Sequence, residues 1–343
     1  MTLHLTDGTI SAFSILNGRR LMITGGTGSF GRACTRLILD HCDPQRLVIF
    51  SRDELKQYEM EQEFSTHPKA GCLRFFIGDV RDPLRVEMAL RDVDFVIHAA
   101  ALKQVPTAEY NPFECIHTNV LGAENVVRAC LRAGVSHVVA LSTDKAASPL
   151  NLYGASKLAS DKIFVAANSL AGRDGTRFAV VRYGNVIGSR GSVVPFFRRL
   201  IAENARTLPI TDERMTRFWI TLEHGVSFVI SCLHSMRGGE IFVPKIPSST
   251  IVDLAKALAP DMPRSVIGIR PGEKLHEVMI TEDDARNTVD LGDRYVIEPV
   301  FKFWDRDGYK SDTRRMHDGF CYSSDGNPDQ LDVESLRALL RKA

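Results

Sequence analysis

Short apolar runs alternate with longer helical patterns through the first half of the chain, and this alternation constrains the fold most strongly. The intervening segments, such as Arg32 to Leu39 and Val120 to Ala133, are long enough to be the crossover helices that join parallel strands. A βαβ pattern of this kind is typical of a parallel sheet with helices on both faces. The apolar runs read RLMITGG, RLVIFS, LRFFIG, FVIHAA, HVVALS and FAVVRYG. We therefore predict an α/β fold with at least six strands in a doubly wound parallel sheet.

The composition changes after Tyr183, where glycine, proline and arginine become frequent. The alternation of apolar runs with helical patterns is also less regular there. One later excursion is expected to return to the sheet, because Glu223 to His234 has the pattern of an amphipathic helix and Glu240 to Val243 that of a strand. From Pro247 onward the pattern indicates small α+β structure. We predict a first domain of residues 1–185 plus about 220–245, and a smaller α+β domain of residues 186–219 and 246–343.

The overall composition narrows the class of partner and the compartment. The 43 basic and 42 acidic residues nearly cancel, so no global field favours nucleic acid or an anionic membrane, and we expect a small-molecule substrate. The seven cysteines are odd in number and never form a C-x-x-C pair, which argues against a disulfide framework and against a zinc site. We expect no bound metal. The first twenty residues lack a signal-peptide pattern and no apolar stretch has the length of a membrane span, so a cytoplasmic protein is predicted.

The first predicted strand ends in TGGTGSFG, with Gly25, Gly28 and Gly31 directly before a helical pattern. Glycine suits this place because the turn is tight, a pyrophosphate must approach bare backbone, and the helix must pack close to the strand. The amides at the helix N-terminus then bind the phosphates. An ordinary glycine turn is the alternative, and the strand-before, helix-after context argues against it. The candidate dinucleotide contacts here are Gly25, Thr27, Gly28, Ser29, Phe30 and Gly31.

The second predicted strand ends at Phe50 and is followed by SRDELK. A carboxylate at the strand tip would bind the ribose diol of NAD, whereas Ser51 and Arg52 suit the 2′-phosphate of NADP. Asp53 leaves open the alternative that this segment is only a well-capped helix start. We predict NADP as the cofactor. The candidate contacts along the rest of the cofactor are Ser51, Arg52, Asp53, Glu54, Leu55, Lys56, Asp79, Val80, Ala99, Ala100 and Ala101.

The segment LSTDKAASPLNLYGASK, residues 141–157, contains the most informative chemistry. Tyr153 and Lys157 are four residues apart, so on a helix they share one face. An ammonium group near a phenol favours the phenolate and moves the tyrosine pKa from about 10 towards neutrality, as a base for a hydroxyl proton requires. Ser142 and Thr143 can hydrogen-bond the same substrate hydroxyl. A chance Y-x-x-x-K pair in a helix is the alternative, and its position after the fifth strand disfavours it.

These motifs resemble the extended short-chain dehydrogenase/reductases, whose TGxxGxxG and YxxxK patterns match residues 24–31 and 153–157. Within them, the chain is similar to the inverting UDP-N-acetylglucosamine 4,6-dehydratases of the pseudaminic acid pathway type, from about residue 15 to about residue 300. The resemblance implies a Rossmann-like fold, bound NADP, UDP-N-acetylglucosamine as substrate, and a homo-oligomer, either dimer or hexamer. The motifs that carry it are SRDELKQ, FFIGDVRD, HAAALK, STDKA, RYGNVIGSRGSVVPFF, ITDERMTRFWIT, GGEIFVPKIPS and GIRPGEKLHEVMI.

The pair Asp144 and Lys145 separates dehydration from simpler redox chemistry. Sugar 4-epimerases of the superfamily usually carry small or hydroxyl residues here, and retaining dehydratases typically carry Asp-Glu. The resemblance implies that Tyr153 takes the C4 hydroxyl proton, Lys145 removes the C5 hydrogen and Asp144 assists loss of the C6 hydroxyl. A lysine can act as that base only if its surroundings lower its pKa. The alternatives are a surface salt bridge at this pair, a 4-epimerase, a retaining dehydratase, and a non-catalytic NADP-binding regulator on the same fold.

The predicted substrate contacts follow from the resemblance and from the charge of UDP, which needs cations and backbone donors. Asn185 follows the last main strand, at the edge where open α/β sheets bind ligands. The segment RPGEKLHE could instead be a loop that caps a helix, and Arg217 could belong to a solvated basic face. The candidates are Lys103, Thr143, Asn185, Arg217, Arg270 and Glu273, with Lys103, Ser142, Tyr153 and Lys157 also near the cofactor.

Overall fold

The computed structural model describes residues 12–172, 175–189, 191–301, 303–304, 308–309 and 313–342. Its largest element is a nine-stranded sheet in the order β14-β15-β10-β6-β5-β4-β1-β2-β3. The seven strands from β10 to β3 in that order are mutually parallel. They are β1 (Arg20–Thr24), β2 (Arg46–Ser51), β3 (Leu73–Ile77), β4 (Phe95–His98), β5 (His137–Leu141), β6 (Arg177–Val181) and β10 (Ile241–Pro244). The prediction of a doubly wound α/β fold is confirmed.

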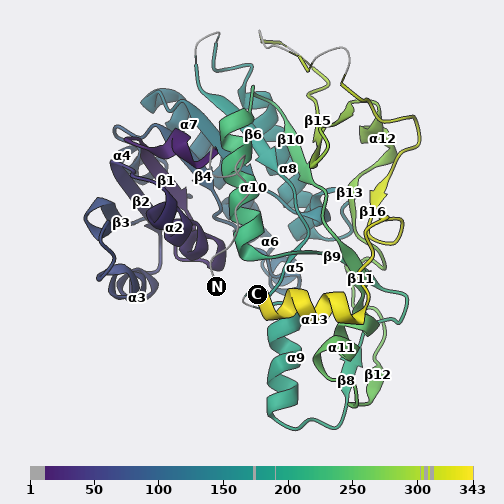
Figure 1. Cartoon of the computed structure of the whole chain (residues 1–343). Coiled ribbons are helices and arrows are strands. Elements are labelled where there is room, and N and C mark those ends of the chain that lie inside the picture. Colours follow the sequence, from purple (N-terminus) through teal and green to yellow (C-terminus); the bar gives the residue numbers. More distant parts are fainter. Residues whose placement is uncertain are drawn as a thin grey trace.

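Helices cover both faces of this sheet, because its central strands are apolar on both sides. On one face α2 (Ser29–His41) packs against α10 (Leu222–Ser235) (Figure 1). On the other face α7 (Gly122–Ala133) lies between α4 (Pro83–Ala89) and α8 (Leu152–Ala167). The short helices of the sheet unit are η1 (Ser14–Leu16), α3 (Glu54–Phe64), η2 (Ala70–Cys72), α5 (Val105–Tyr110), α6 (Pro112–Ile116), the π-helical turn η3 (His117–Leu121) and η4 (Asp144–Ala146). The chain returns to this unit at α10 and β10, since α10 packs against α2 and β10 pairs with β6.

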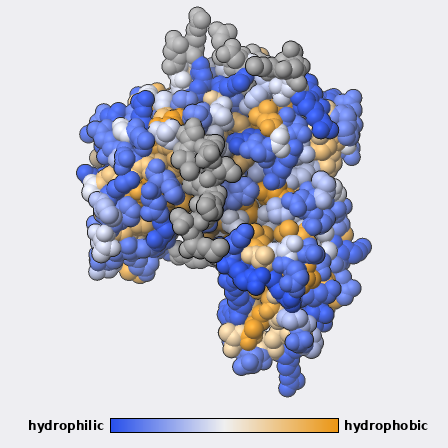
Figure 2. All heavy atoms as spheres, viewed as in Figure 1, coloured by the Kyte–Doolittle hydropathy of each residue, from blue (hydrophilic) through white to orange (hydrophobic). Residues whose placement is uncertain are grey.

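A smaller unit lies below one end of the large sheet in the view of Figure 1. Its core is separate from that of the sheet and is built around buried Phe197, Trp219, Leu254 and Leu336. Its elements are α9 (Val193–Ala202), β8 (Leu208–Ile210), α11 (Ile251–Leu258), β12 (Arg264–Val266) and α13 (Val333–Lys342). Figure 2 shows apolar side chains gathered on this unit over α9, whereas most of the visible surface is hydrophilic.

Three short sheets accompany the large one. The strands β7 (Asn185–Val186), β9 (Thr216–Ile220) and β11 (Ser248–Thr250) form one of them, and β12 pairs with β8 within the smaller unit. In the third, β13 (Val278–Ile280) pairs with β16 (Tyr322–Ser323) and is followed by α12 (Glu282–Ala285). The strand β9 joins the two units, because Phe218 is buried in the large core and Trp219 in the smaller one.

The structure differs from the predicted domain boundary in one segment. The sequence pattern places residues 246–343 in the smaller domain, but β15 (Arg294–Ile297) pairs antiparallel with β10 and β14 (Thr288–Asp290) pairs antiparallel with β15, so both extend the large sheet. The physical reason is burial, because Val289 and Val296 are fully buried in the core of the large unit. The chain therefore returns to the large unit once more than the sequence pattern indicates, before α13 takes it back to the smaller unit.

Candidate active site

The glycine turn after β1 has the geometry of a phosphate cradle. Gly25 has a φ of +65°, and a Cβ atom there would lie 2.9 Å from the backbone of Ala100. A Cβ atom on Gly31 would overlap the carbonyl oxygen of Gly26. Gly28 caps α2 without a side-chain hydrogen bond, so the first amides of the helix remain available to an anion. Thr27, Ser29 and Phe30 lie in the same turn, so the six predicted residues come together here.

The end of β4 lies beside this turn and is held by Thr24. The amides of Ala99 and Ala100 donate to Thr24 Oγ1 over 3.2 and 3.3 Å, so the hydroxyl hydrogen of Thr24 is left to donate to His98 Nδ1, 2.8 Å away. Burial lowers the pKa of His98 to about 3, with a further contribution from the charge of Lys157. A neutral imidazole therefore anchors the strand end, and the predicted alanines at 99–101 are half-buried next to the glycine turn.

The tip of β2 presents one half-exposed cation. Ser51 is buried, and Gln57 Nε2 donates both to its carbonyl over 3.0 Å and to its hydroxyl over 3.1 Å. Arg52 remains 54% exposed, with Nη1 only 3.6 Å from Asp79 Oδ2. Val80, the neighbour of Asp79, is buried. Arg52 can therefore reach a bound anion by giving up a weak surface contact.

The alternative role of Asp53 as a helix cap is also realised. Its Oδ1 accepts from the amide of Lys56 over 3.0 Å, and its Oδ2 contacts the ammonium group of the same lysine. The predicted contacts Glu54 and Leu55 are exposed in the first turn of α3. Asp53 thus caps α3 and neutralises Lys56, which leaves Arg52 as the better candidate for a phosphate contact at this strand tip.

Tyr153 and Lys157 are both buried on one face of α8, as their spacing predicts. The electrostatics differ from the prediction. Burial raises the pKa of Tyr153 to about 12, and the groups that oppose this rise are the charge of Lys145 and a hydrogen bond with Thr143. Burial also lowers the pKa of Lys157, while the neighbouring Asp161 partly offsets the effect. The cation that most favours the phenolate is therefore Lys145 rather than Lys157.

Ser142 and Thr143 point into different networks. Ser142 Oγ donates to Asp161 Oδ2 over 2.9 Å, and the same carboxylate oxygen lies 3.3 Å from Arg182 Nη2. Thr143 Oγ1 instead donates to Asp144 Oδ1 over 2.9 Å. Of the two hydroxyls, Thr143 is the one that joins the tyrosine and the Asp-Lys pair.

Asp144 and Lys145 form a buried ion pair in the turn η4. Lys145 Nζ lies 3.0 Å from Asp144 Oδ1, and the aspartate side chain is only 1% exposed. The alternative of a surface salt bridge is therefore wrong. Burial raises the pKa of Asp144, and the negative charge of a second carboxylate, Glu277, adds to this rise. Burial lowers the pKa of Lys145, but Asp144 and Glu277 raise it by more, so the lysine is held as an ammonium ion.

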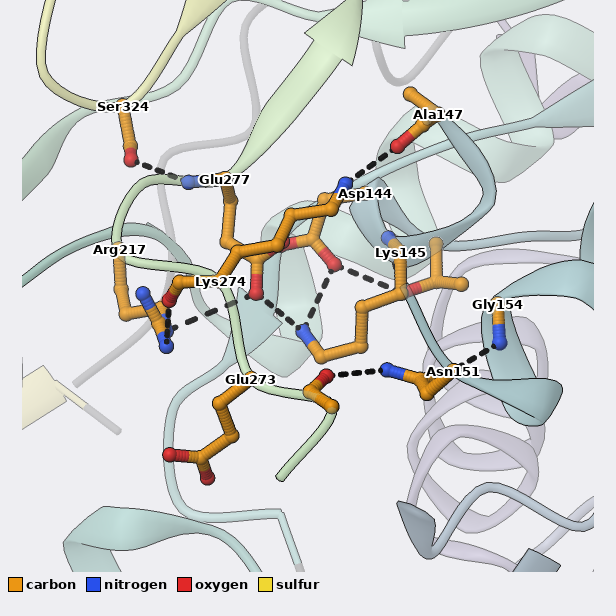
Figure 3. Close-up of polar contacts among 12 residues, drawn as sticks. Asp144, Lys145, Ala147, Asn151, Gly154, Arg217, Glu273, Lys274, Glu277 and Ser324 are labelled. Carbon is orange, nitrogen blue, oxygen red and sulfur yellow. Dashed lines mark hydrogen bonds and ion pairs between the residues drawn. The ribbon is translucent and has the colours of Figure 1, made fainter. Parts of the chain in front are cut away.

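Glu277 is the residue that the sequence analysis missed. Its Oε1 lies 3.0 Å from Lys145 Nζ and 3.7 Å from Arg217 Nε, so Lys145 sits between two carboxylates (Figure 3). Arg217 is buried, and its remaining donors bind the carbonyls of residues 216, 274 and 275. Burial raises the pKa of Glu277, but the two cations lower it by more. A glutamate directly before the apolar strand β13 was the signal available in RPGEKLHEVMI.

The loop that carries Glu277 is tied across the start of α8. Asn151 Nδ2 donates to the carbonyl of Gly272 over 2.8 Å, and the ammonium group of Lys274 contacts the carbonyl of Ala147 (Figure 3). The amide of Glu277 donates to Ser324 Oγ over 2.9 Å. These bonds come from both units, and together they hold the loop over the Asp-Lys turn.

The remaining predicted substrate residues lie in β7, in the tied loop and after β4. Asn185 begins β7 and is half-buried, and its Nδ2 is buried with no hydrogen-bond partner among the described residues. Arg270 is half-exposed and lies 3.7 Å from Glu273 in the tied loop, where Glu273 Oε2 is also buried without a described partner. Lys103 is exposed, past the end of β4. Unpartnered buried polar atoms of this kind are suited to a polar ligand.

Comparison with known proteins identifies the family. The family described as polysaccharide biosynthesis protein matches residues 21–299. The chain belongs to this family. A relative from Campylobacter jejuni, UDP-N-acetylglucosamine 4,6-dehydratase (inverting), is 58% identical over 92% of this chain and 95% of its own length. A UDP-glucose 4-epimerase from Rickettsia canadensis is 46% identical over 81% of this chain and 82% of its own length. The predicted resemblance to the inverting dehydratases is confirmed.

Solved structures of other proteins share the fold of this chain. The crystal structure of Pen from Bacillus thuringiensis has a TM-score of 0.87 at 34% identity, over 95% of this chain and 98% of that one. A dTDP-glucose 4,6-dehydratase from Streptomyces venezuelae, DesIV, has a TM-score of 0.67 at 25% identity, over 75% and 86% of the two chains.

Membrane-spanning helices and metal-binding clusters are both absent from the described residues. No helix there is both long enough and apolar enough to cross a membrane. In the same ranges, no group of three or more His, Cys, Asp or Glu side chains is arranged to hold a metal ion.

Proposed function

We propose that this chain is an inverting UDP-N-acetylglucosamine 4,6-dehydratase that yields UDP-2-acetamido-2,6-dideoxy-β-L-arabino-hex-4-ulose. The observation that carries the proposal is the buried cluster of Asp144, Lys145 and Glu277 beside Tyr153. A hydride shuttle at C4 needs only the tyrosine, whereas elimination also needs a base for the C5 hydrogen and an acid for the C6 hydroxyl. The identity of 58% to a relative that bears this name supports the same conclusion.

The residues of the glycine turn fit a nicotinamide dinucleotide. Gly25 and Gly31 leave no room for a Cβ atom, and α2 presents uncapped amides, as a pyrophosphate requires. The structure of DesIV contains NAD, which supports a cofactor of this class. We propose NADP specifically, because Arg52 is a half-exposed cation at the tip of β2 and the carboxylate directly after it, Asp53, is used as a helix cap.

The proposed chemistry assigns one task to each side chain of the cluster. The chemistry that a bound nicotinamide dinucleotide supplies is reversible hydride transfer, out of C4 and back into C6. Tyr153 accepts the C4 hydroxyl proton as the phenolate, which Lys145 and Thr143 stabilise, and becomes the neutral phenol. The ketone at C4 makes the C5 hydrogen acidic. Lys145, in its amine form, takes that proton, while Asp144 gives a proton to the C6 oxygen as the C–O bond breaks.

The elevated pKa of Asp144 suits the role of acid, because it favours a carboxyl that still holds its proton. The elevated pKa of Lys145 does not suit a base, and the sequence analysis required the opposite shift. The amine form must therefore arise as a minor species, which couples the rate to pH. This requirement makes the neighbours of Lys145 part of the mechanism.

The two units divide the remaining tasks. We propose that the sheet unit binds the dinucleotide, and that Lys103 of this unit binds the UDP-sugar together with Asn185, Arg217, Arg270 and Glu273 of the later strands and the tied loop. A cytoplasmic homo-oligomer, dimer or hexamer, acting in pseudaminic acid biosynthesis and flagellin glycosylation, stays a prediction from the resemblance.

Product analysis tests the proposal against its main alternative. The purified protein is incubated with UDP-N-acetylglucosamine, and the products are followed by NMR. A 4-keto sugar with a new C6 methyl group is expected. Accumulation of the C4 epimer with its C6 hydroxyl intact would instead assign a 4-epimerase, the activity in the name of the Rickettsia relative. A C6-methyl product with unchanged configuration at C5 would assign a retaining dehydratase.

A further inference from the structure

The cluster around Lys145 contains two buried carboxyl groups that share its ammonium group. Asp144 and Glu277 are 1% and 2% exposed, and each lies 3.0 Å from the ammonium group, while a second cation, Arg217, lies 3.7 Å from Glu277 only. Two neighbouring carboxylates repel each other and are costly to ionise away from water, so one carboxyl is expected to hold a proton. The question is which of the two does so.

The hydrogen bonds distinguish the two carboxyls. Asp144 Oδ1 accepts from both Lys145 and Thr143, whereas Asp144 Oδ2 is buried and has no partner among the described residues. Oδ2 can therefore bear a proton without breaking an existing bond. Glu277 Oε2 is likewise unpartnered, but Glu277 Oε1 faces two cations, Lys145 and Arg217.

The surrounding charges favour the same assignment. Burial raises the pKa of Asp144 and the charge of Glu277 raises it further, whereas Lys145 and Arg217 bring the pKa of Glu277 below its usual value. Lys274, whose pKa is lowered by burial, and the phenol of Tyr153, whose pKa is raised by burial, also lie near the cluster. All three cations face Glu277, and only Lys145 bonds to Asp144.

We propose that Glu277 is a positioning residue for the elimination, which holds Lys145 from the side opposite Asp144 and keeps the proton of the cluster on Asp144 Oδ2. This inference rests on the proposed function, and it names the source of the proton that the leaving C6 hydroxyl receives. In the step itself the Oδ2 proton passes to the C6 oxygen as the C6–O bond breaks, and the C5 proton passes to the amine of Lys145. One proton enters the cluster and one leaves, so its net charge is unchanged.

The first test measures the proton directly, without substrate. Infrared difference spectra of the full chain between neutral and alkaline pH should contain the carbonyl band of a protonated carboxylic acid. The band should vanish in Asp144→Asn. In Glu277→Gln, which keeps shape but loses charge, the band should disappear at a pH lower by about one unit or more. Glu277→Asp keeps the charge and should keep the band.

The second test uses the pH dependence of turnover, which a merely structural residue would not shift. Activity requires the proton on Asp144 and the amine form of Lys145, so the profile should be bell-shaped. Removal of the negative charge of Glu277 lowers the pKa of both groups, and both limbs of the Glu277→Gln profile should therefore move to lower pH. At the wild-type optimum kcat should fall by about tenfold. Glu277→Asp should leave the position of the profile near that of wild type.

Glu298→Gln is the matched control, because Glu298 is a buried carboxylate that lies 3.0 Å from an arginine, Arg315, outside the cluster. It should alter neither the band nor the profile. A wild-type spectrum without the Asp144 band would overturn the inference, as would a Glu277→Gln protein with an unshifted band or with reduced but unshifted activity. If Glu277→Gln does not fold, the wild-type, Asp144→Asn and Glu277→Asp spectra decide. A wild-type enzyme that makes no 6-deoxy product contradicts the proposed function, whatever the spectra contain.

Discussion

The glycine turn after β1 and the charged cluster at η4 are built in opposite ways. The turn is made of backbone, and its members are contiguous between Gly25 and Gly31 apart from the facing backbone of Ala100. The cluster is made of side chains, and Glu277 reaches Lys145 from a loop far along the chain. A site made of backbone depends on space, whereas a site made of buried side chains depends on charge. The two should therefore respond differently to small substitutions.

The largest effect is expected at Lys145, where the cluster loses its central cation. Lys145→Ala should lower formation of the 6-deoxy product by about 1,000-fold or more, because the base for C5 is removed. Oxidation at C4 should persist, so reduced nicotinamide should accumulate in a single-turnover absorbance experiment. Lys245→Ala also takes a lysine from a carboxylate, Asp290, and should leave product formation near the wild-type rate. An ordinary rate in Lys145→Ala would make Lys145 a structural residue.

Tyr153→Phe should act on the earlier step. The ring keeps its packing but loses the proton acceptor, so oxidation at C4 should slow by about 100-fold or more, measured by the appearance of reduced nicotinamide. Tyr322→Phe removes another buried phenol oxygen, which donates to the carbonyl of Ile246, and should affect stability rather than rate. Near-normal oxidation in Tyr153→Phe would exclude the tyrosine as the base.

An added methyl group in the glycine turn should weaken dinucleotide binding for lack of space, although no charge changes. In Gly31→Ala the new methyl group would overlap the carbonyl oxygen of Gly26, which should cost about 2 kcal/mol, or about 30-fold in dinucleotide affinity by calorimetry. Gly225 lies in α10, where the nearest atom to an added Cβ is 3.9 Å away. Gly225→Ala should bind the dinucleotide normally. Equal affinities of both variants would mean that the turn does not contact the pyrophosphate.

The smallest effect is expected at Arg52, where the cofactor side depends on charge at a half-exposed position. Arg52→Ala should weaken NADP⁺ binding by about tenfold and leave NAD⁺ binding unchanged, because only NADP⁺ carries the 2′-phosphate. Arg128→Ala, which removes an arginine from an exposed pair with Glu124, is the control. Wild-type protein with equal affinity for the two dinucleotides would contradict the assignment of NADP.

Much of the fold was predictable because its elements carry strong local patterns. Each of the six strands from β1 to β6 is a short apolar run, and all except the edge strand β3 are buried along most of their length. The strands β14 and β15 have only three and four residues, with one apolar residue in β14 and three in β15, so their return to the sheet edge was not predicted. Their place depends on burial of Val289 and Val296 against the large core, which is a tertiary property.

In the candidate site, too, local patterns were predictable and tertiary contacts were not. The glycine turn and the Tyr153–Lys157 pair were predictable because spacing alone brings their members together. Glu277 was not, since its role arises from contact with Lys145 and Arg217 across the two units. The direction of the Lys145 pKa shift was also beyond the sequence, because it depends on how many carboxylates surround the ammonium group.

Solvent-isotope incorporation at C5 tests the central claim, that the charged cluster drives an inverting elimination. Wild-type protein turns over UDP-N-acetylglucosamine in heavy water, and NMR reads both the deuterium content and the configuration at C5. We predict a 6-deoxy-4-keto product with inverted C5 that carries solvent deuterium. Recovered sugar that has lost no water, or a product whose C5 keeps its original configuration, would contradict the account.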